Sequence, residues 1–148
     1  MRVLLVILLL PSICLASDFA SAPLLKLVVT SGFGMRIHPI KGGHRFHKGV
    51  DLASPVGTPI YSVASGIVVF AGGFGGYGNL IVIRHTDKLS THFGHCKDFK
   101  VSVGDKVKRG AFIGTVGDTG AVTGPHLHFE VRYDGKPQSP DSAISLKN

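Results

Sequence analysis

Short apolar runs separated by frequent glycines are the feature that most limits what this chain can fold into. Glycine occupies 20 of the 148 positions and interrupts the sequence every few residues. No segment keeps the three-to-four residue apolar spacing of an amphipathic helix, and the runs between turn signals are short and rich in valine, isoleucine and threonine. The pattern predicts an all-β fold. The expected strands cover residues 58–63, 66–71, 80–85, 90–95, 111–116 and 126–133.

The N-terminus has a pattern of its own. A short basic start precedes an uninterrupted aliphatic run at 3–10, and small residues follow at a cleavage-site spacing. A membrane-spanning helix needs about 20 apolar residues, so this run is too short for an anchor. We expect a secretory signal peptide over 1–16, with an end near Ala20 as the alternative. The protein is then exported, to the periplasm or the cell exterior, with an extended lead-in at 17–30 and one domain at 31–148.

Charge and cysteine content narrow the expected partners. The formal net charge of +7 suits an anionic partner such as a cell wall, although solubility explains it equally well. No cluster of Lys and Arg with interleaved aromatic residues is present, so we expect no nucleic-acid binding.

Ile13 precedes Cys14, which argues against lipidation, and signal removal leaves Cys96 as the one cysteine. We therefore expect a monomer without an intramolecular disulfide and, after cleavage, without a membrane partner.

Histidines at alternate positions mark one predicted strand, where residues 126–131 read His-Leu-His-Phe-Glu-Val. Side chains alternate between the two faces of a strand, so His126, His128 and Glu130 should point one way and the apolar residues between them into a core. Residues two apart on a strand lie about 7 Å from each other at Cα. Both imidazoles can therefore address a single metal centre, one as ligand and one as neighbour.

A histidine and a carboxylate lie close together earlier in the chain. His47 and Asp51 are four residues apart, and Gly49 with the nearby Pro55 argues against a helix. We expect both residues on a loop that leads into a short strand. Two histidines and Asp51 would make a zinc-binding set whose fourth position stays open for water. Taken singly, Asp51 is better explained as a loop cap or a surface salt-bridge partner.

A third segment, residues 90–96, holds two further histidines. His92 and His95 are three apart, which puts them on opposite faces of a regular strand. Only one of them is then able to join a site shared with the other segments.

Together the three segments resemble the lysostaphin-like zinc endopeptidases, the M23 family of cell-wall hydrolases. The family marks are a His-x3-Asp segment, a Tyr-x-His-Leu-like segment and a His-x-His segment, in that order. Residues 47–51, 93–96 and 126–128 match them here, and 31–40 looks like the lead-in that is common in the family. The resemblance runs from about residue 31 to residue 140.

The resemblance implies a function and a set of site residues. His47, Asp51 and His128 match the zinc ligands, with one Zn²⁺ per chain, and His95 and His126 match the two catalytic histidines. The implied reaction is zinc-dependent hydrolysis of peptide cross-links or bridges in bacterial peptidoglycan. The implied fold is a compact antiparallel β domain of stacked sheets, similar to a duplicated hybrid motif, with a loop-lined zinc cleft.

The chain departs from the family pattern at three positions. Phe93 stands where tyrosine is frequent, Cys96 where leucine is usual and Met35 where tryptophan is more usual. None of these is a predicted ligand, and we expect Cys96 to be a small buried residue in an apolar slot.

Three other functions remain open at this point. A non-catalytic family member would activate another wall enzyme, but such proteins typically lose zinc ligands. A lipoyl- or biotin-carrier domain is suggested by the hairpin-like segment 101–116, although the histidines and signal peptide do not fit it. A zinc carboxypeptidase would share the chemistry and trim stem ends. The cleaved bond is also open between D-alanyl-diaminopimelate cross-links, glycine bridges and other stem linkages.

Overall fold

The computed structural model describes residues 22–37, 40 and 42–142, and confirms the all-β prediction. Within these residues the regular structure is antiparallel strands with two short 3-10 turns and no α-helix. The first elements are β1 (Val29–Ser31), β2 (Gly34–Ile37), β3 (His44–His47), β4 (Val50–Ala53) and β5 (Pro59–Tyr61). The remaining elements are β6 (Gly66–Gly73), η1 (Gly75–Tyr77), β7 (Asn79–Arg84), β8 (Leu89–Phe99), β9 (Lys106–Val107), β10 (Phe112–Val116), β11 (His126–Tyr133), β12 (Lys136–Gln138) and η2 (Pro140–Ser142).

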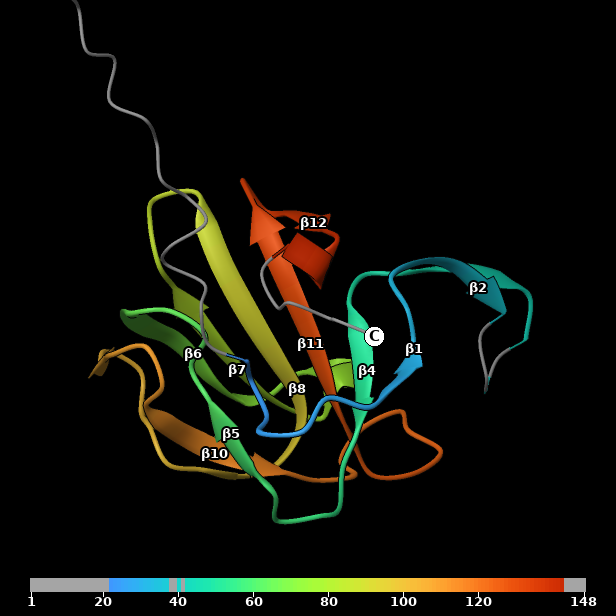
Figure 1. Cartoon of the computed structure of the whole chain (residues 1–148), viewed down its shortest axis with the longest axis horizontal. Helices are drawn as coiled ribbons and strands as arrows, with labels where there is room; N and C mark the ends of the chain where they lie inside the picture. Colours follow the sequence, from blue (N-terminus) through green and yellow to red (C-terminus); the bar gives the residue numbers. More distant parts are fainter. Residues whose placement is uncertain (1–21, 38–39, 41, 143–148) are drawn as a thin grey trace, which may run out of the picture.

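The main sheet has the strand order β1-β4-β11-β8-β7-β6-β9, so β11 and β8 form its centre. The long strands β8 and β11 run side by side, and β5 and β10 lie next to each other at one end of the sheet (Figure 1). β10 pairs with both β5 and the end of β8, and β2 pairs with β3 in a separate two-stranded ribbon. Three strands from distant parts of the chain, β4, β11 and β8, therefore meet edge to edge, which is what brings the histidine segments together.

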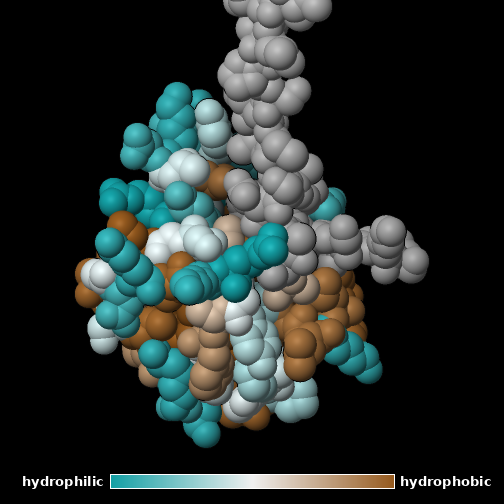
Figure 2. Space-filling model, turned by 60° about the vertical axis from the view of Figure 1, so that its left-hand side comes forward, coloured by the Kyte–Doolittle hydropathy of each residue, from teal (hydrophilic) through white to brown (hydrophobic). Residues whose placement is uncertain are grey.

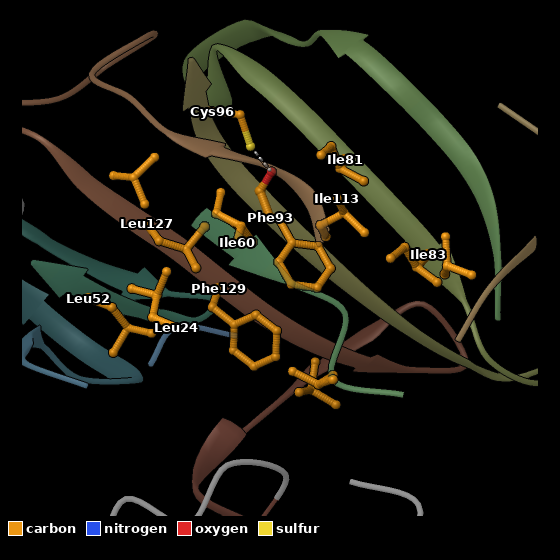
Figure 3. Packing of buried hydrophobic residues seen from close by; sticks show 14 of the residues in the cluster. Leu24, Leu52, Ile60, Ile81, Ile83, Phe93, Cys96, Ile113, Leu127 and Phe129 are labelled. Atoms are coloured by element: carbon orange, nitrogen blue, oxygen red, sulfur yellow. Dashed lines mark hydrogen bonds between the residues drawn. The ribbon is translucent and has the colours of Figure 1, made fainter. Parts of the chain in front are cut away.

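The core lies against one face of this sheet. Leu127 and Phe129 of β11 are fully buried and pack with Phe93 and Leu52 from the neighbouring strands (Figure 3). The predicted alternation in β11 is thus confirmed: its apolar residues enter the core and its polar residues occupy the other face. Burying these apolar side chains contributes about 2 kcal/mol each, and it fixes the register that aligns the polar face. On the face of the molecule shown in Figure 2, hydrophobic and hydrophilic residues are interspersed.

Strand β8 is not regular, contrary to the expectation for residues 92–95. The pairing register shifts along β8, and His95 has a positive φ of 63°. Phe93 and Cys96 consequently both enter the core although they are three residues apart. The bulge also turns His95 onto the polar face, so His92 and His95 do not lie on opposite faces as a regular strand requires. Cys96 is fully buried, as expected, and its thiol donates a hydrogen bond to the Phe93 carbonyl.

The predicted loop around His47 is also partly wrong. His47 is the last residue of β3, and Asp51 lies inside β4 rather than before it. A tight turn joins the two strands. A Cβ atom on Gly49 would come within 2.2 Å of the Phe129 carbonyl oxygen, so the turn requires glycine here. The sequence does not indicate β3 as a strand, because three of its four residues are exposed and show no alternation of burial.

The predicted signal peptide lies outside the described residues. Of the predicted lead-in at 17–30, Leu24 is buried in the core and Val29 pairs with Leu52 of β4. In the part of the chain that the structure describes, no helix is long and apolar enough to cross a membrane.

Candidate zinc site

Three strands place the predicted ligand residues together. His128 lies directly opposite Asp51 in the β4–β11 pairing, and His47 reaches them from the end of β3. His47 Nε2 lies 3.1 Å from both Asp51 Oδ1 and His128 Nδ1, and His128 Nδ1 lies 2.8 Å from Asp51 Oδ1. All three residues are buried, and among the described residues they form the group whose donor atoms are close enough to share one metal ion.

The geometry of this group fits zinc. Zn–N and Zn–O bonds of about 2.0–2.1 Å at tetrahedral angles separate two ligand atoms by about 3.3 Å. The observed separations of 2.8–3.1 Å are close to that value. Two imidazole nitrogens and one carboxylate oxygen are also the ligand types of catalytic zinc sites, which keep a fourth position for water.

The outer ring nitrogens of both ligand histidines have acceptors that orient the rings. His47 Nδ1 donates to the Gly32 carbonyl at 2.7 Å, and His128 Nε2 donates to Glu130 Oε1 at 2.9 Å. With these tautomers, the lone pairs of the inner nitrogens converge on Asp51 Oδ1. A cation among the three atoms removes the repulsion between these acceptors, and an oriented ligand histidine of this kind is typical of zinc sites.

Glu130 is the centre of a buried polar network behind His128. Its side chain is fully buried, and it accepts hydrogen bonds from Tyr77 Oη at 2.6 Å and Arg132 Nε at 2.7 Å. Burial would raise the pKa of Glu130, but the hydrogen bonds from His128, Tyr77 and Arg132 outweigh it and lower the pKa to about 2. Glu130 is therefore an anion at neutral pH, and it makes His128 a more basic ligand.

The carboxylate of Asp51 is also held in its charged form. Burial would raise its pKa, but the interactions with His128 and His47 keep the pKa far below its usual range. Arg36 Nη2 adds a further contact, 3.4 Å from Asp51 Oδ2. Burial lowers the pKa of His128, yet hydrogen bonds to Asp51 and Glu130 raise it above the ordinary value, so protons compete with the metal for this ligand.

The two predicted catalytic histidines lie beside the ligands. The ring centroids of His95 and His126 are 4.7 Å apart, and His95 is 5.8 Å from the ring of His128. His95 Nδ1 donates to the Thr119 carbonyl and His126 Nδ1 to the Gly124 carbonyl. Each residue thereby keeps Nε2 free as a proton acceptor. Burial and the nearby His126 and His128 lower the pKa of His95 to about 4, so its imidazole is neutral at pH 7.

The site opens into a cleft of about 690 Å³. One wall is the β2–β3 ribbon, and the others are the η1 turn and a loop around Val122. The glycine-rich segment 72–78 supplies Gly76 and Tyr77 to this lining. Sequence reasoning did not assign roles to Tyr77, Arg36 or Glu130. Only Glu130 carried a signal, since it shares the strand face of His128.

The remaining described histidines lie outside the cleft lining. His92 is on the same face as Glu130, but its Nε2 is 3.5 Å from Ser90 Oγ, and His85 bonds to Thr91 Oγ1 at 2.8 Å. We expect His92→Gln and His85→Gln to keep most of the hydrolytic activity, with at most about 1 kcal/mol of lost stability for the broken hydrogen bonds. Initial rates and thermal unfolding of both variants check this. A loss as large as that of a ligand variant would mean that the wrong histidine was assigned.

A second expected result concerns Glu130. Glu130→Gln removes the negative charge behind His128 and should weaken zinc binding about 10- to 100-fold, the usual cost of losing such a partner. Competition with a chelator of known affinity measures it, and Asp98→Asn, an exposed carboxylate outside the cleft, is the matched control. Unchanged zinc affinity in a folded Glu130→Gln protein would show that Glu130 has no influence on the metal.

Comparisons with known proteins agree on one family. The model of peptidase family M23 matches residues 45–140. The chain is 44% identical over 124 residues to the DD-carboxypeptidase/endopeptidase Mpg of Neisseria meningitidis, and 40% identical over 123 residues to the peptidoglycan DD-endopeptidase ShyC of Vibrio cholerae. The matches cover 84% and 82% of this chain but only 29% and 28% of those proteins. The chain thus spans less than a third of the length of these relatives.

Solved structures give the same result. A zinc-containing peptidase from Vibrio cholerae superposes with a TM-score of 0.78 at 38% identity, covering 86% of this chain and 40% of that one. The catalytic domain of lysostaphin from Staphylococcus simulans superposes with a TM-score of 0.70 at 36% identity, covering 77% of this chain and 89% of that domain.

Proposed function

Because the chain belongs to peptidase family M23, we propose that it is a zinc-dependent peptidase that hydrolyses peptide cross-links or bridges of bacterial peptidoglycan. The observation that carries the proposal is the set of His47, Asp51 and His128, which supplies three ligand atoms at zinc distances with two further histidines beside it. A closed structural site would use four protein ligands, whereas a three-ligand set leaves a coordination position for the reaction.

The proposed chemistry assigns each residue a task. Zinc in this set would act as a Lewis acid and supply a water nucleophile at neutral pH. His95 and His126 both present a free Nε2 to the cleft, so either is able to take the proton of the attacking water. The protonated ring then donates to the developing oxyanion or to the leaving amine. Glu130 and the Gly32 carbonyl keep the ligand rings oriented throughout.

The names of the relatives support both the substrate and the type of bond. ShyC is a peptidoglycan DD-endopeptidase, and Mpg combines DD-carboxypeptidase and endopeptidase in its name. We therefore propose DD-bond hydrolysis in peptidoglycan for this chain, with carboxypeptidase action on stem ends as the second activity. Action on the cell wall also accords with export of the protein, which the N-terminal sequence predicts.

Digestion of purified peptidoglycan tests the proposal. We expect the zinc-loaded protein to convert dimeric muropeptides into monomers, each cut adding one water, and to leave the glycan chains intact. Chelation should stop the reaction and added zinc should restore it. Mass spectrometry of the soluble products measures this. Dimers that persist with the zinc-loaded protein, or cuts in the glycan, would contradict the proposal.

A further inference from the structure

Among the described residues, all of the lysine and arginine side chains that line the cleft lie on one wall. Arg36, Arg45 and Lys48 come from β2, β3 and the residue after β3, whereas the Ala121–Thr123 loop across the cleft carries no charge. We infer that this wall binds a carboxylate of the substrate, and that the carboxylate belongs to the residue on the amine side of the cleaved bond. The inference rests on the proposed function and specifies its substrate class.

The pairing of the β2–β3 ribbon directs these cations toward the zinc site. Arg36 lies opposite Arg45, and Gly34 lies opposite His47. Residues two apart share a strand face, so Arg36 and Arg45 are on the same face of the ribbon as the ligand His47. Arg36 demonstrates this directly, since its guanidinium contacts the Asp51 carboxylate at 3.4 Å. In Figure 1 the ribbon stands beside β1 and β4, and its residues Arg36, Arg45 and His47 line the cleft.

The cleft has more positive charge than its own acids neutralise. Its two acidic lining residues are Asp51, which belongs to the zinc set, and Glu130, which is fully buried and bonded to its own partners. Arg45 and Lys48 have no ion pair with any described residue. Like charges directly opposite on neighbouring strands, as at Arg36 and Arg45, are destabilising unless an anion lies between them. A bound carboxylate would supply that anion.

Distances along a peptide place this carboxylate. From the attacked carbonyl carbon, three backbone bonds of about 1.3–1.5 Å lead through the amide nitrogen and the next α-carbon to its carboxyl carbon. The carboxyl carbon there lies about 3–4 Å from the attacked carbon, and its oxygens lie at most about 5 Å from it. Arg36, in contact with a zinc ligand, is within reach of such a group, and Arg45 is beside it. An arginine pair of this kind favours a planar carboxylate over a neutral amide.

This position separates the possible wall substrates. A D-alanyl-D-alanine stem end and a D-alanyl-diaminopimelate cross-link both carry a free carboxylate on the carbon next to the cleaved amide. A residue inside a glycine bridge carries a neutral amide in that place. One recognition site thus accounts for endopeptidase and carboxypeptidase action together, and it disfavours glycine bridges.

The test compares substrates that differ only in this group. The first pair is a cross-linked muropeptide whose diaminopimelyl carboxyl group is either free or amidated. The second pair is a D-alanyl-D-alanine stem peptide whose terminal carboxyl group is either free or amidated. Pentaglycine serves as a separate substrate that represents a glycine bridge. We expect kcat/KM to be about 10- to 100-fold higher for each free acid than for its amide, the usual effect of a charge-assisted hydrogen bond. Pentaglycine should be cleaved no faster than the amides. The two pairs of substrates distinguish a cross-link carboxylate from a chain-terminal one.

Variants identify the residues responsible. Arg45→Gln, which removes a cation that contacts no zinc ligand, should lower the rate on the free acids toward that on the amides with zinc content unchanged. Arg36→Gln should do the same when it is compared at full zinc loading, because its guanidinium also contacts the zinc ligand Asp51. Arg84→Gln, on an exposed part of β7, should keep the wild-type preference. Equal rates on acid and amide by the wild-type protein, or a fall on both substrates alike in Arg45→Gln, would overturn the inference while leaving the proposed function intact. A zinc-loaded wild-type protein that cleaves none of these substrates would overturn both.

Discussion

Replacing His128 with alanine is expected to remove zinc from the protein and to abolish its activity. His128 lies within hydrogen-bond distance of both His47 and Asp51, and Glu130 orients its ring from behind. Loss of an orienting partner alone typically costs about 10- to 100-fold in metal affinity, so loss of the ligand itself should cost more than about 100-fold. Elemental analysis of the purified variant and its rate of peptidoglycan digestion measure the two effects.

The control for this variant is His85→Gln, which changes a histidine outside the cleft and should retain zinc. Thermal unfolding with excess chelator shows whether His128→Ala is folded. A folded His128→Ala protein with full zinc occupancy would mean that His128 is not a ligand.

Replacing His95 or His126 with alanine is expected to preserve zinc and the fold but to slow hydrolysis about 10²- to 10⁴-fold. That is the usual cost of losing a positioned acid–base or electrostatic group. Both rings lie beside the zinc set, with Nε2 left free by the hydrogen bonds at Nδ1. Zinc content and digestion rate, measured on the same preparation of each variant, test the assignment.

His95 allows a sharper version of the experiment. Its backbone has a positive φ of 63°, which asparagine tolerates better than most residues. His95→Asn should therefore be at least as stable as His95→Ala, and yet as slow, because an amide cannot take a proton at neutral pH. Recovery of most of the activity in His95→Asn would contradict a proton-transfer role.

For His126 the contradicting result is different. Its Nε2 lies 3.6 Å from Asp51 Oδ1, close to the zinc set but outside the group that shares one metal. If His126→Ala lost its metal along with its activity, the site would be a closed four-ligand site and the peptidase function would have to be abandoned.

The strand that carries His126 and His128 was the most predictable part of the molecule. Apolar and polar residues alternate strictly along it, because one face of the strand packs into the core and the other faces the site. The residue types alone therefore indicate both which face is buried and which carries the chemistry. The short strands elsewhere in the fold were less predictable. Short exposed strands such as β3 show no pattern, and only pairing with β2 makes them extended.

The arrangement around His95 could not be predicted from local sequence. A regular strand would separate His92 from His95, and the bulge that brings His95 to the polar face depends on the partners of β8 on both sides. The Tyr77–Glu130–Arg132 network could not be predicted from the sequence either, because Tyr77 is 53 residues from Glu130 in the chain. Contacts of this range depend on which strands pair, and the pattern within one segment does not contain that information.

The most direct test of the account is an anomalous difference map from a crystal of the zinc-loaded protein, measured on both sides of the zinc absorption edge. We expect one zinc peak per chain among His47 Nε2, Asp51 Oδ1 and His128 Nδ1, with a fourth coordination position open to the cleft and facing the Nε2 atoms of His95 and His126. A peak closed off by His126 as a fourth ligand, or no peak at these three residues, would contradict it.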